Sequence, residues 1–199
     1  LNPHPIVYSV VVEDIPILEY FLGNDRALEN FSKLNMDSAL EYAQSNNIEI
    51  LRILCTFLNV SEHTKYFPKT PIEQYIIQAI RRNYSIDVLD CYFSLGIVPY
   101  SFQNERDQLS LLHTAVLSKN LNAARYLIEH NADSSNLKND SGDTPLSLAI
   151  RKNNVEMAEL LATAPDLDVN VKIKKKSLLQ LAESKQLMTV VKLLSDKGI

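Results

Sequence analysis

The sequence predicts an all-α fold made of stacked helical repeats. Six times along its 199 residues it repeats one seven-residue pattern: apolar, polar, two apolar, polar, two apolar. A period in the range of 20 to 50 residues is typical of repeat proteins, in which each unit packs against its neighbours. The pattern begins at positions 33 to 38 residues apart, namely Ile15, Ile48, Ile86, Leu121, Val155 and Met188.

Each seven-residue pattern predicts a helix that is buried between neighbours. Apolar side chains at five of the seven positions cover a wider stripe than a surface helix shows. The fifth position always carries a charge, as in Glu19, Arg52 and Asp90, and is expected to face solvent. We therefore expect these helices, the second of each repeat, near residues 15–22, 48–58, 86–95, 121–130, 155–163 and 188–197.

A shorter apolar segment begins nine residues before each pattern and predicts a first helix, antiparallel to the second. The first of these segments contains the β-branched run from Val10 to Val12, which by itself favours a strand. Gly96, Asn131 and Gly198 follow second helices at the point where a C-terminal cap favours a positive φ. The six segments begin at Ile6, Ala39, Ile77, Leu112, Leu146 and Leu179.

Two first helices open on related motifs, Thr144-Pro145-Leu146-Ser147 and Ser110-Leu111-Leu112-His113. Thr144 is suited to cap its helix, and proline loses no needed hydrogen bond at the first helical position. Asn131-Ala132-Asp133 follows a second helix. These motifs resemble the Thr-Pro-Leu-His turn and the Gly-Ala-Asp cap of the ankyrin repeat. The resemblance implies an ankyrin-repeat solenoid of about six stacked helix-turn-helix repeats with short hairpin fingers. It also implies that His113 hydrogen-bonds between neighbouring repeats.

The resemblance implies a single ankyrin-repeat domain over residues 1–199, and the sequence is expected to be a fragment of a longer protein. It is strongest over 109–199 and weakest over 60–108, where one step is 38 residues long. Either the first helix of the third repeat is about a turn longer, or the loop before it is extended. The repeats are expected at roughly 3–35, 36–69, 70–108, 109–142, 143–175 and 176–199.

Composition predicts an intracellular globular protein. Apolar residues make up 46% and charged residues 22% of the chain, which argues against disorder. The net charge of −4 gives no general attraction to nucleic acid. The longest apolar run, residues 5–12, is far shorter than the ~20 residues that span a bilayer. Cys55 and Cys91 are expected to be buried free thiols, and a disulfide is the alternative.

The sequence shows no pattern of catalytic, cofactor-binding or metal-binding residues. Its four histidines are spread over different repeats, and none pairs with a cysteine at the spacing of metal ligands. Its four glycines are isolated, so no glycine-rich phosphate loop is present. We therefore expect no enzymatic activity, no cofactor and no metal in these residues.

Two loops carry aromatic residues that the helical pattern leaves unexplained. Tyr66 and Phe67 lie in one loop, and Tyr100 and Phe102 alternate in a second loop that is expected to form a hairpin. Exposed aromatic side chains are favoured anchors of protein interfaces. We expect these four rings to anchor a partner protein, with Arg106 at the rim of the interface. The alternative is that the rings fold back and cover the edge of the stack.

Other candidates lie on the first helices and the last finger. Ser118, Arg151 and Lys152 are expected on the concave face and are the next choice for partner binding. The basic run 172–176 suits an acidic partner or an anionic lipid, and the alternative is a solvated finger.

Two classes of function are compatible with these observations. The first is a protein–protein interaction module that binds another protein through its concave face and fingers. The second is a structural or substrate-presenting arm of a larger enzyme, whose catalytic domain lies outside this sequence. The imperfect repeats, the many Asn and Ile residues and the few glycines resemble ankyrin proteins of intracellular bacteria such as Legionella. That resemblance implies an effector that acts inside a host cell.

Overall fold

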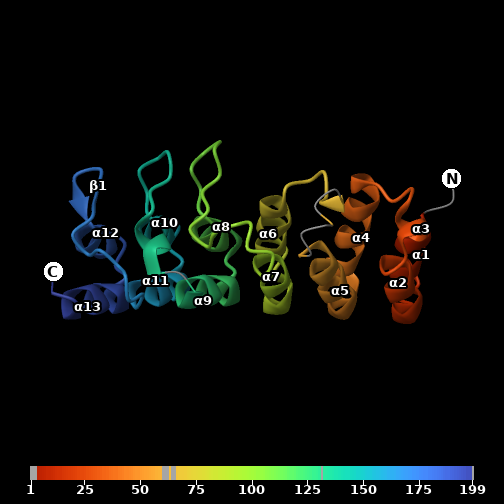
Figure 1. Ribbon diagram of the computed structural model, residues 1–199. Coiled ribbons are helices and arrows are strands. Elements are labelled where there is room, and N and C mark those ends of the chain that lie inside the picture. The colour runs from red at the N-terminus through yellow and green to blue at the C-terminus, as the bar shows by residue number, and fades with distance from the viewer. Residues whose placement is uncertain (1–3, 60–62, 64–65, 131, 199) are drawn as a thin grey trace. The chain divides into compact units, whose positions relative to one another are not determined.

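The computed structural model of the protein describes residues 4–59, 63, 66–130 and 132–198. The chain divides into two compact units. Unit 1 consists of Leu1–Ala79 with Tyr84–Pro99, and unit 2 consists of Ile80–Asn83 with Tyr100–Ile199. Both units are built from antiparallel helical pairs (Figure 1). The predicted boundaries of the single repeat domain stay a prediction.

Unit 1 contains three helical pairs. Helix α6 belongs to the third pair, and its last two residues are assigned to unit 2. A short helix, α3, follows the first pair. Within the unit, α1 packs against α4, and α5 packs against both α2 and α7. The core of the unit is therefore formed between neighbouring pairs. The helices are α1 (Pro5–Val11), α2 (Ile15–Leu22), α3 (Asp25–Leu28), α4 (Lys33–Asn46), α5 (Ile48–Leu58), α6 (Ile72–Arg81) and α7 (Ile86–Phe93).

Unit 2 contains three further pairs, and its first helices α8, α10 and α12 pack in sequence, as do its second helices α9, α11 and α13. Three hairpin-like fingers rise from the side of the first helices (Figure 1). The elements are α8 (Leu111–Ser118), α9 (Leu121–His130), the 3-10 helix η2 (Ala132–Asn136), α10 (Pro145–Arg151), α11 (Val155–Ala162), β1 (Lys172–Ile173), β2 (Lys176–Ser177), α12 (Leu178–Ser184) and α13 (Met188–Asp196).

The structure confirms the predicted fold class and all six predicted second helices. Each begins at the predicted residue and ends within two residues of the predicted end. The β-branched N-terminal segment is also helical: Pro5 occupies the first turn, and the His4 side chain accepts a hydrogen bond from the Ile6 amide. Ile6 and Val10 are fully buried in this helix. Tertiary packing therefore outweighs the strand propensity of the segment.

The first helix of the third pair is about one turn longer than the first helices of unit 2. Helices α1, α8, α10 and α12 each begin ten residues before their second helix, whereas α6 begins fourteen residues before α7 and α4 begins fifteen residues before α5. The loop before α6, residues 59–71, is no longer than the loops 131–144 and 163–177. The extra chain thus adds about one turn to the N-terminal end of α6.

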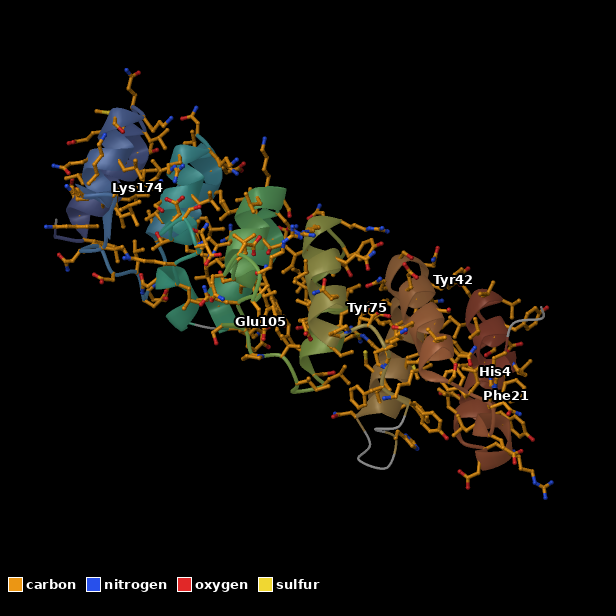
Figure 2. All side chains as sticks on the ribbon, turned by 90° about the horizontal axis from the view of Figure 1, so that it is seen from above. His4, Phe21, Tyr42, Tyr75, Glu105 and Lys174 are labelled. Atoms are coloured by element: carbon orange, nitrogen blue, oxygen red, sulfur yellow. The ribbon has the colours of Figure 1, made fainter. Side chains whose placement is uncertain are left out.

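A carboxylate on α4 fixes the start of α6. Asp37 accepts hydrogen bonds from the amides of Lys69 and Thr70, both at 3.0 Å, and from Tyr75 Oη at 2.7 Å. Burial alone would raise the pKa of Asp37, but these hydrogen bonds favour the charged carboxylate and hold its pKa below the ordinary value. Tyr42, which also lies on α4, donates its hydroxyl to the Val11 carbonyl at 3.1 Å. Figure 2 labels Tyr42 and Tyr75.

Two of the three predicted C-terminal caps are confirmed. Gly96 has a φ of 66° and Gly198 a φ of 94°, both in the left-handed region that glycine adopts without steric cost. Asn131, the third, lies outside the described residues. Cys55 and Cys91 are buried free thiols, as expected.

Candidate partner-binding surface

The predicted anchor Tyr66 is part of the core of unit 1. Its side chain is only 7% exposed. The centroid of its ring lies 6.0 Å from the ring centroid of Phe31 and 5.6 Å from that of Phe57. The expectation of an exposed ring is therefore wrong for Tyr66, because aromatic side chains from two other segments close over it. Phe67 follows it in the loop and is half-buried.

Tyr100 and Phe102 lie at the base of the first finger of unit 2, and both are half-buried. The Tyr100 ring stacks on His130 with 5.3 Å between centroids and lies 6.1 Å from the ring of Tyr126. The Phe102 carbonyl accepts a hydrogen bond from the Leu111 amide at 3.3 Å. Tyr100 thus contributes to the packing of this end of unit 2, and the role of both residues in binding stays a prediction.

The first two fingers of unit 2 are joined by hydrogen bonds. Finger 1 (residues 103–110) is closed by a bridge between Gln103 and Ser110, so the hairpin begins after Tyr100 and Phe102, which were expected to lie within it. The Gln103 side-chain amide donates to the Lys138 carbonyl in finger 2 (residues 138–143) at 3.0 Å. The Asp140 amide donates to the Asp107 carbonyl at 3.1 Å. The two fingers therefore hold each other in place, and the predicted rim residue Arg106 is exposed in finger 1. Figure 2 looks down on the fingers and labels Glu105.

His113 joins the first two repeats of unit 2. Its Nδ1 accepts a hydrogen bond from the Ser110 amide at 3.2 Å, and its Nε2 donates to the Asp143 carbonyl at 2.9 Å. The ring is fully buried, and burial lowers its pKa. These contacts confirm the predicted hydrogen bond between neighbouring repeats. Both ring nitrogens are engaged within the stack, and the acceptor role of Nδ1 requires the neutral form of the ring.

The network continues from His113 to the predicted site residue Arg151. The buried carboxylate of Asp143 accepts hydrogen bonds from the Arg151 guanidinium and from the Ser147 hydroxyl. The Thr144 side chain caps α10 and Pro145 occupies its first turn, as the sequence predicts. Arg151 is exposed at the end of this helix. Its position is therefore set by the same network that fixes the repeat.

The other two predicted residues of the concave face differ in exposure. Ser118 is half-buried at the end of α8 and donates its hydroxyl to the Thr114 carbonyl at 2.8 Å. Lys152 is exposed and forms the C-terminal cap of α10. Ser118, Arg151 and Lys152 thus lie at the C-terminal ends of two first helices that pack against each other.

A basic pocket lies between α10, α12 and the third finger. Finger 3 (residues 172–177) consists of β1 and β2, with Lys172 paired to Ser177 and Ile173 paired to Lys176. The pocket has a volume of about 530 Å³. Its floor includes the buried Ile173 and the half-buried Leu181. Four cationic side chains line it, namely Arg151, Lys174, Lys176 and Lys185.

Sequence reasoning found part of this pocket. It singled out the run 172–176 and Arg151, but it did not bring them together, and it missed Lys185. A signal for Lys185 exists: Lys119, Lys152 and Lys185 are 33 residues apart, and each forms the C-terminal cap of a first helix. Cations at this position interact favourably with the helix dipole, so the spacing by itself does not indicate a binding site.

A second and larger hollow lies on the opposite row of helices. It has a volume of about 650 Å³ between α9, α11 and α13. Its charged lining residues are of both signs, three acidic and two basic, so it lacks the concentrated positive charge of the basic pocket. These residues are Arg125, Glu156, Glu159, Lys192 and Asp196.

Within the described part of the chain, no group of three His, Cys, Asp or Glu side chains is placed to hold a metal ion. None of the helices of the described residues is both long and apolar enough to cross a membrane.

Comparison with known proteins agrees with this architecture. Residues 76–173 match the family model for ankyrin repeats in three copies. An ankyrin repeat protein of Acanthamoeba polyphaga mimivirus is 30% identical over 175 residues, which cover 75% of this chain and 24% of the viral protein. The chain thus spans about a quarter of the length of that relative.

Solved structures of ankyrin repeat domains share the fold. The ankyrin repeat domain of Bcl-3, a member of the IkappaB protein family, has a TM-score of 0.68 at 20% sequence identity. The match covers 98% of this chain and 86% of the Bcl-3 chain. A domain from Acinetobacter baumannii AYE has a TM-score of 0.68 at 18% identity and covers 99% of both chains. The chain therefore carries ankyrin repeats and folds as an ankyrin-repeat solenoid, a class of scaffold that binds other proteins.

Proposed function

We propose that the chain binds a partner protein through the finger face of unit 2. This surface comprises fingers 1, 2 and 3 and the exposed sides of α8, α10 and α12. The proposal is supported by the family, since ankyrin repeats are protein–protein interaction modules that generally lack catalytic activity. A stack of repeats offers a continuous surface of this kind, which a partner can contact along several units.

The observation that carries the proposal is that hydrogen bonds tie fingers 1 and 2, and the helices beneath them, to one another. Gln103 and Asp107 tie finger 1 to finger 2, and His113 and Asp143 tie the underlying helices together. A surface that needs no ordering on binding avoids the entropic cost of immobilising loops. The face also presents Leu117 on α8, which is 46% exposed and so offers apolar area to a partner.

The finer assignments from the sequence stay predictions. The host-targeting effector and the intracellular location rest on composition alone, and the curated relative is a viral protein. The alternative, an arm of a larger enzyme, is compatible with the viral protein being about four times longer than the matched region. The two classes differ in whether the chain captures a partner by itself.

Site-specific photo-crosslinking tests the proposal. A benzoylphenylalanine at Leu117 places the reactive group on the finger face, and one at Thr163, which is also exposed, places it at the end of the second helix α11. Each variant is expressed in the source cells, irradiated, purified and analysed by mass spectrometry. We expect a discrete protein adduct from position 117 and none from position 163.

Either of two results would contradict the proposal. An adduct that forms equally from both positions would show non-specific contact. The lack of any adduct from position 117, in a variant whose circular dichroism spectrum matches that of the wild type, would favour the inert arm.

A further inference from the structure

Finger 3 carries lysines at a turn that favours other residues. The register of β1 and β2 leaves Lys174 and Lys175 as a two-residue loop, and their φ angles are 49° and 72°. A two-residue hairpin with positive φ at both positions is a type I′ turn, which favours Asn-Gly because these residues adopt left-handed backbone most readily. The conformation of the turn therefore does not explain why these two positions carry lysine.

The basic pocket concentrates positive charge on a chain that is acidic as a whole. The net charge of the chain is −4, yet Lys174, Lys176 and Lys185 converge on one pocket with Arg151. Among the described residues that line the pocket there is no aspartate or glutamate. The three lysines are exposed, and none of them forms an ion pair with a described residue. The Asp143 carboxylate engages one nitrogen of the Arg151 guanidinium.

The pocket also has an apolar component. Ile173 is 4% exposed and Leu181 is half-buried, and both contribute to the lining. An anion alone would gain nothing from these two side chains. A peptide that carries an apolar side chain next to carboxylates would fill the floor and neutralise the rim.

We propose that the basic pocket between finger 3, α10 and α12 binds an acidic segment of the partner protein. Carboxylates of that segment contact Lys174, Lys176 and Lys185, and an aliphatic side chain beside them packs on Ile173 and Leu181. This inference rests on the proposed function and names the chemistry of the partner. A flat bilayer surface would touch the finger tip without filling the floor. A nucleic acid strand would offer phosphates to the lysines but no aliphatic side chain to pack on Ile173 and Leu181.

A fluorescein-labelled peptide of glutamates flanking one leucine tests the pocket directly by fluorescence anisotropy. We expect saturable binding to the full chain that weakens with added salt, because exposed ion pairs are screened. A peptide with glutamine in place of glutamate should not bind. Phosphatidylserine vesicles and a single-stranded DNA oligonucleotide serve as the competing probes.

Two variants remove the charge without removing the finger. Lys174→Asn/Lys175→Gly gives the turn its favoured residues, so the melting temperature should stay the same or rise while the peptide binds less tightly. Lys176→Gln/Lys185→Gln removes two charges from the finger and α12, and binding should weaken roughly fivefold or more. Lys33→Gln/Lys192→Gln, a matched control, removes two exposed charges elsewhere and should bind as the wild type. Arg151 is left unchanged, since its loss would leave the buried Asp143 unpaired.

The outcomes separate this inference from the proposed function. Equal affinity of the pocket variants and the control for the acidic peptide would overturn the inference. So would binding of the vesicles or the DNA in place of the peptide. A partner that is crosslinked at position 117 but binds the pocket variants as tightly as the wild type would overturn the inference alone. The absence of that adduct would count against the proposed function, while the peptide measurement would still decide the chemistry of the pocket.

Discussion

At the scale of single residues, the stability of unit 2 depends on a histidine that is held neutral. The Nδ1 of His113 accepts the Ser110 amide and its Nε2 donates to the Asp143 carbonyl, so protonation of Nδ1 would place two donors face to face. Burial lowers the pKa of His113 below the ordinary value of 6.5. The unfolded chain therefore binds a proton at this residue at a higher pH than the folded chain does.

The first prediction is that the free energy of unfolding falls as the pH falls from 7 to 5. Between the two pKa values of His113 the unfolded state binds more protons, so stability rises with pH in that window and is lost on acidification. Urea titrations followed by circular dichroism measure the effect. His113→Gln should be less stable at pH 7 and should lose less stability on acidification. A variant with the same pH dependence as the wild type would rule out His113 as the cause.

A second residue-scale prediction concerns the polar network in the core of unit 1. The buried Tyr92 hydroxyl donates to Gln44 Oε1 at 3.1 Å, and the Gln44 side-chain amide donates to Gln78 Oε1 at 3.1 Å. Tyr92→Phe removes the donor and leaves the Gln44 oxygen buried without it, which costs about 1–3 kcal/mol. Urea titration measures the loss. Tyr20→Phe, at a ring that is 64% exposed, is the control and should be neutral. Equal stability of the two variants would show that the hydrogen bond is unimportant.

At the scale of elements, the second helices were predictable because their apolar positions recur with helical spacing and at a nearly constant period. That pattern reflects burial between neighbouring repeats, so it gives both the position of each helix and the face that it buries. Leu127 closes the pattern in α9 and Leu161 closes it in α11, and each is only 1% exposed. The expected register is therefore confirmed at both positions.

Truncation of these two leucines tests the packing of the second helices. Leu127→Ala and Leu161→Ala should each lower the free energy of unfolding by about 2–5 kcal/mol, because each leaves a cavity that the neighbouring helices cannot fill. Chemical denaturation gives the values. Leu117→Ala, at an exposed position of α8, should change stability little. Losses below ~1 kcal/mol for both buried sites would contradict the packing.

The loops were less predictable, because the burial of their side chains depends on residues that are distant in the sequence. Tyr66 was expected to be exposed, but Phe31 and Phe57 close over it from the end of the first repeat and from α5. No pattern in the neighbouring sequence predicts such a contact. The basic pocket was unpredictable for the same reason. It is formed by three segments that only the stacking of the repeats brings together, which contain Arg151, finger 3 and Lys185.

At the scale of the whole molecule, the two units contain the helical pairs that the sequence predicts. The period of the apolar pattern was sufficient to predict the fold class. The finger face of unit 2 combines two properties that arise at different scales. Hydrogen bonds between repeats fix fingers 1 and 2, and the lysines of finger 3 and α12 give its far end a positive charge. The central claim is that a partner protein binds this face rather than the row of second helices.

Hydrogen–deuterium exchange of the chain, alone and with the partner captured by crosslinking, tests this claim most directly. Amides that a partner covers or stabilises exchange more slowly, so the footprint reports the bound surface. We predict slower exchange in residues 103–118, 138–151 and 172–184, with little change in 121–130, 155–162 and 188–196. Slower exchange confined to the second helices α9, α11 and α13 would contradict the account.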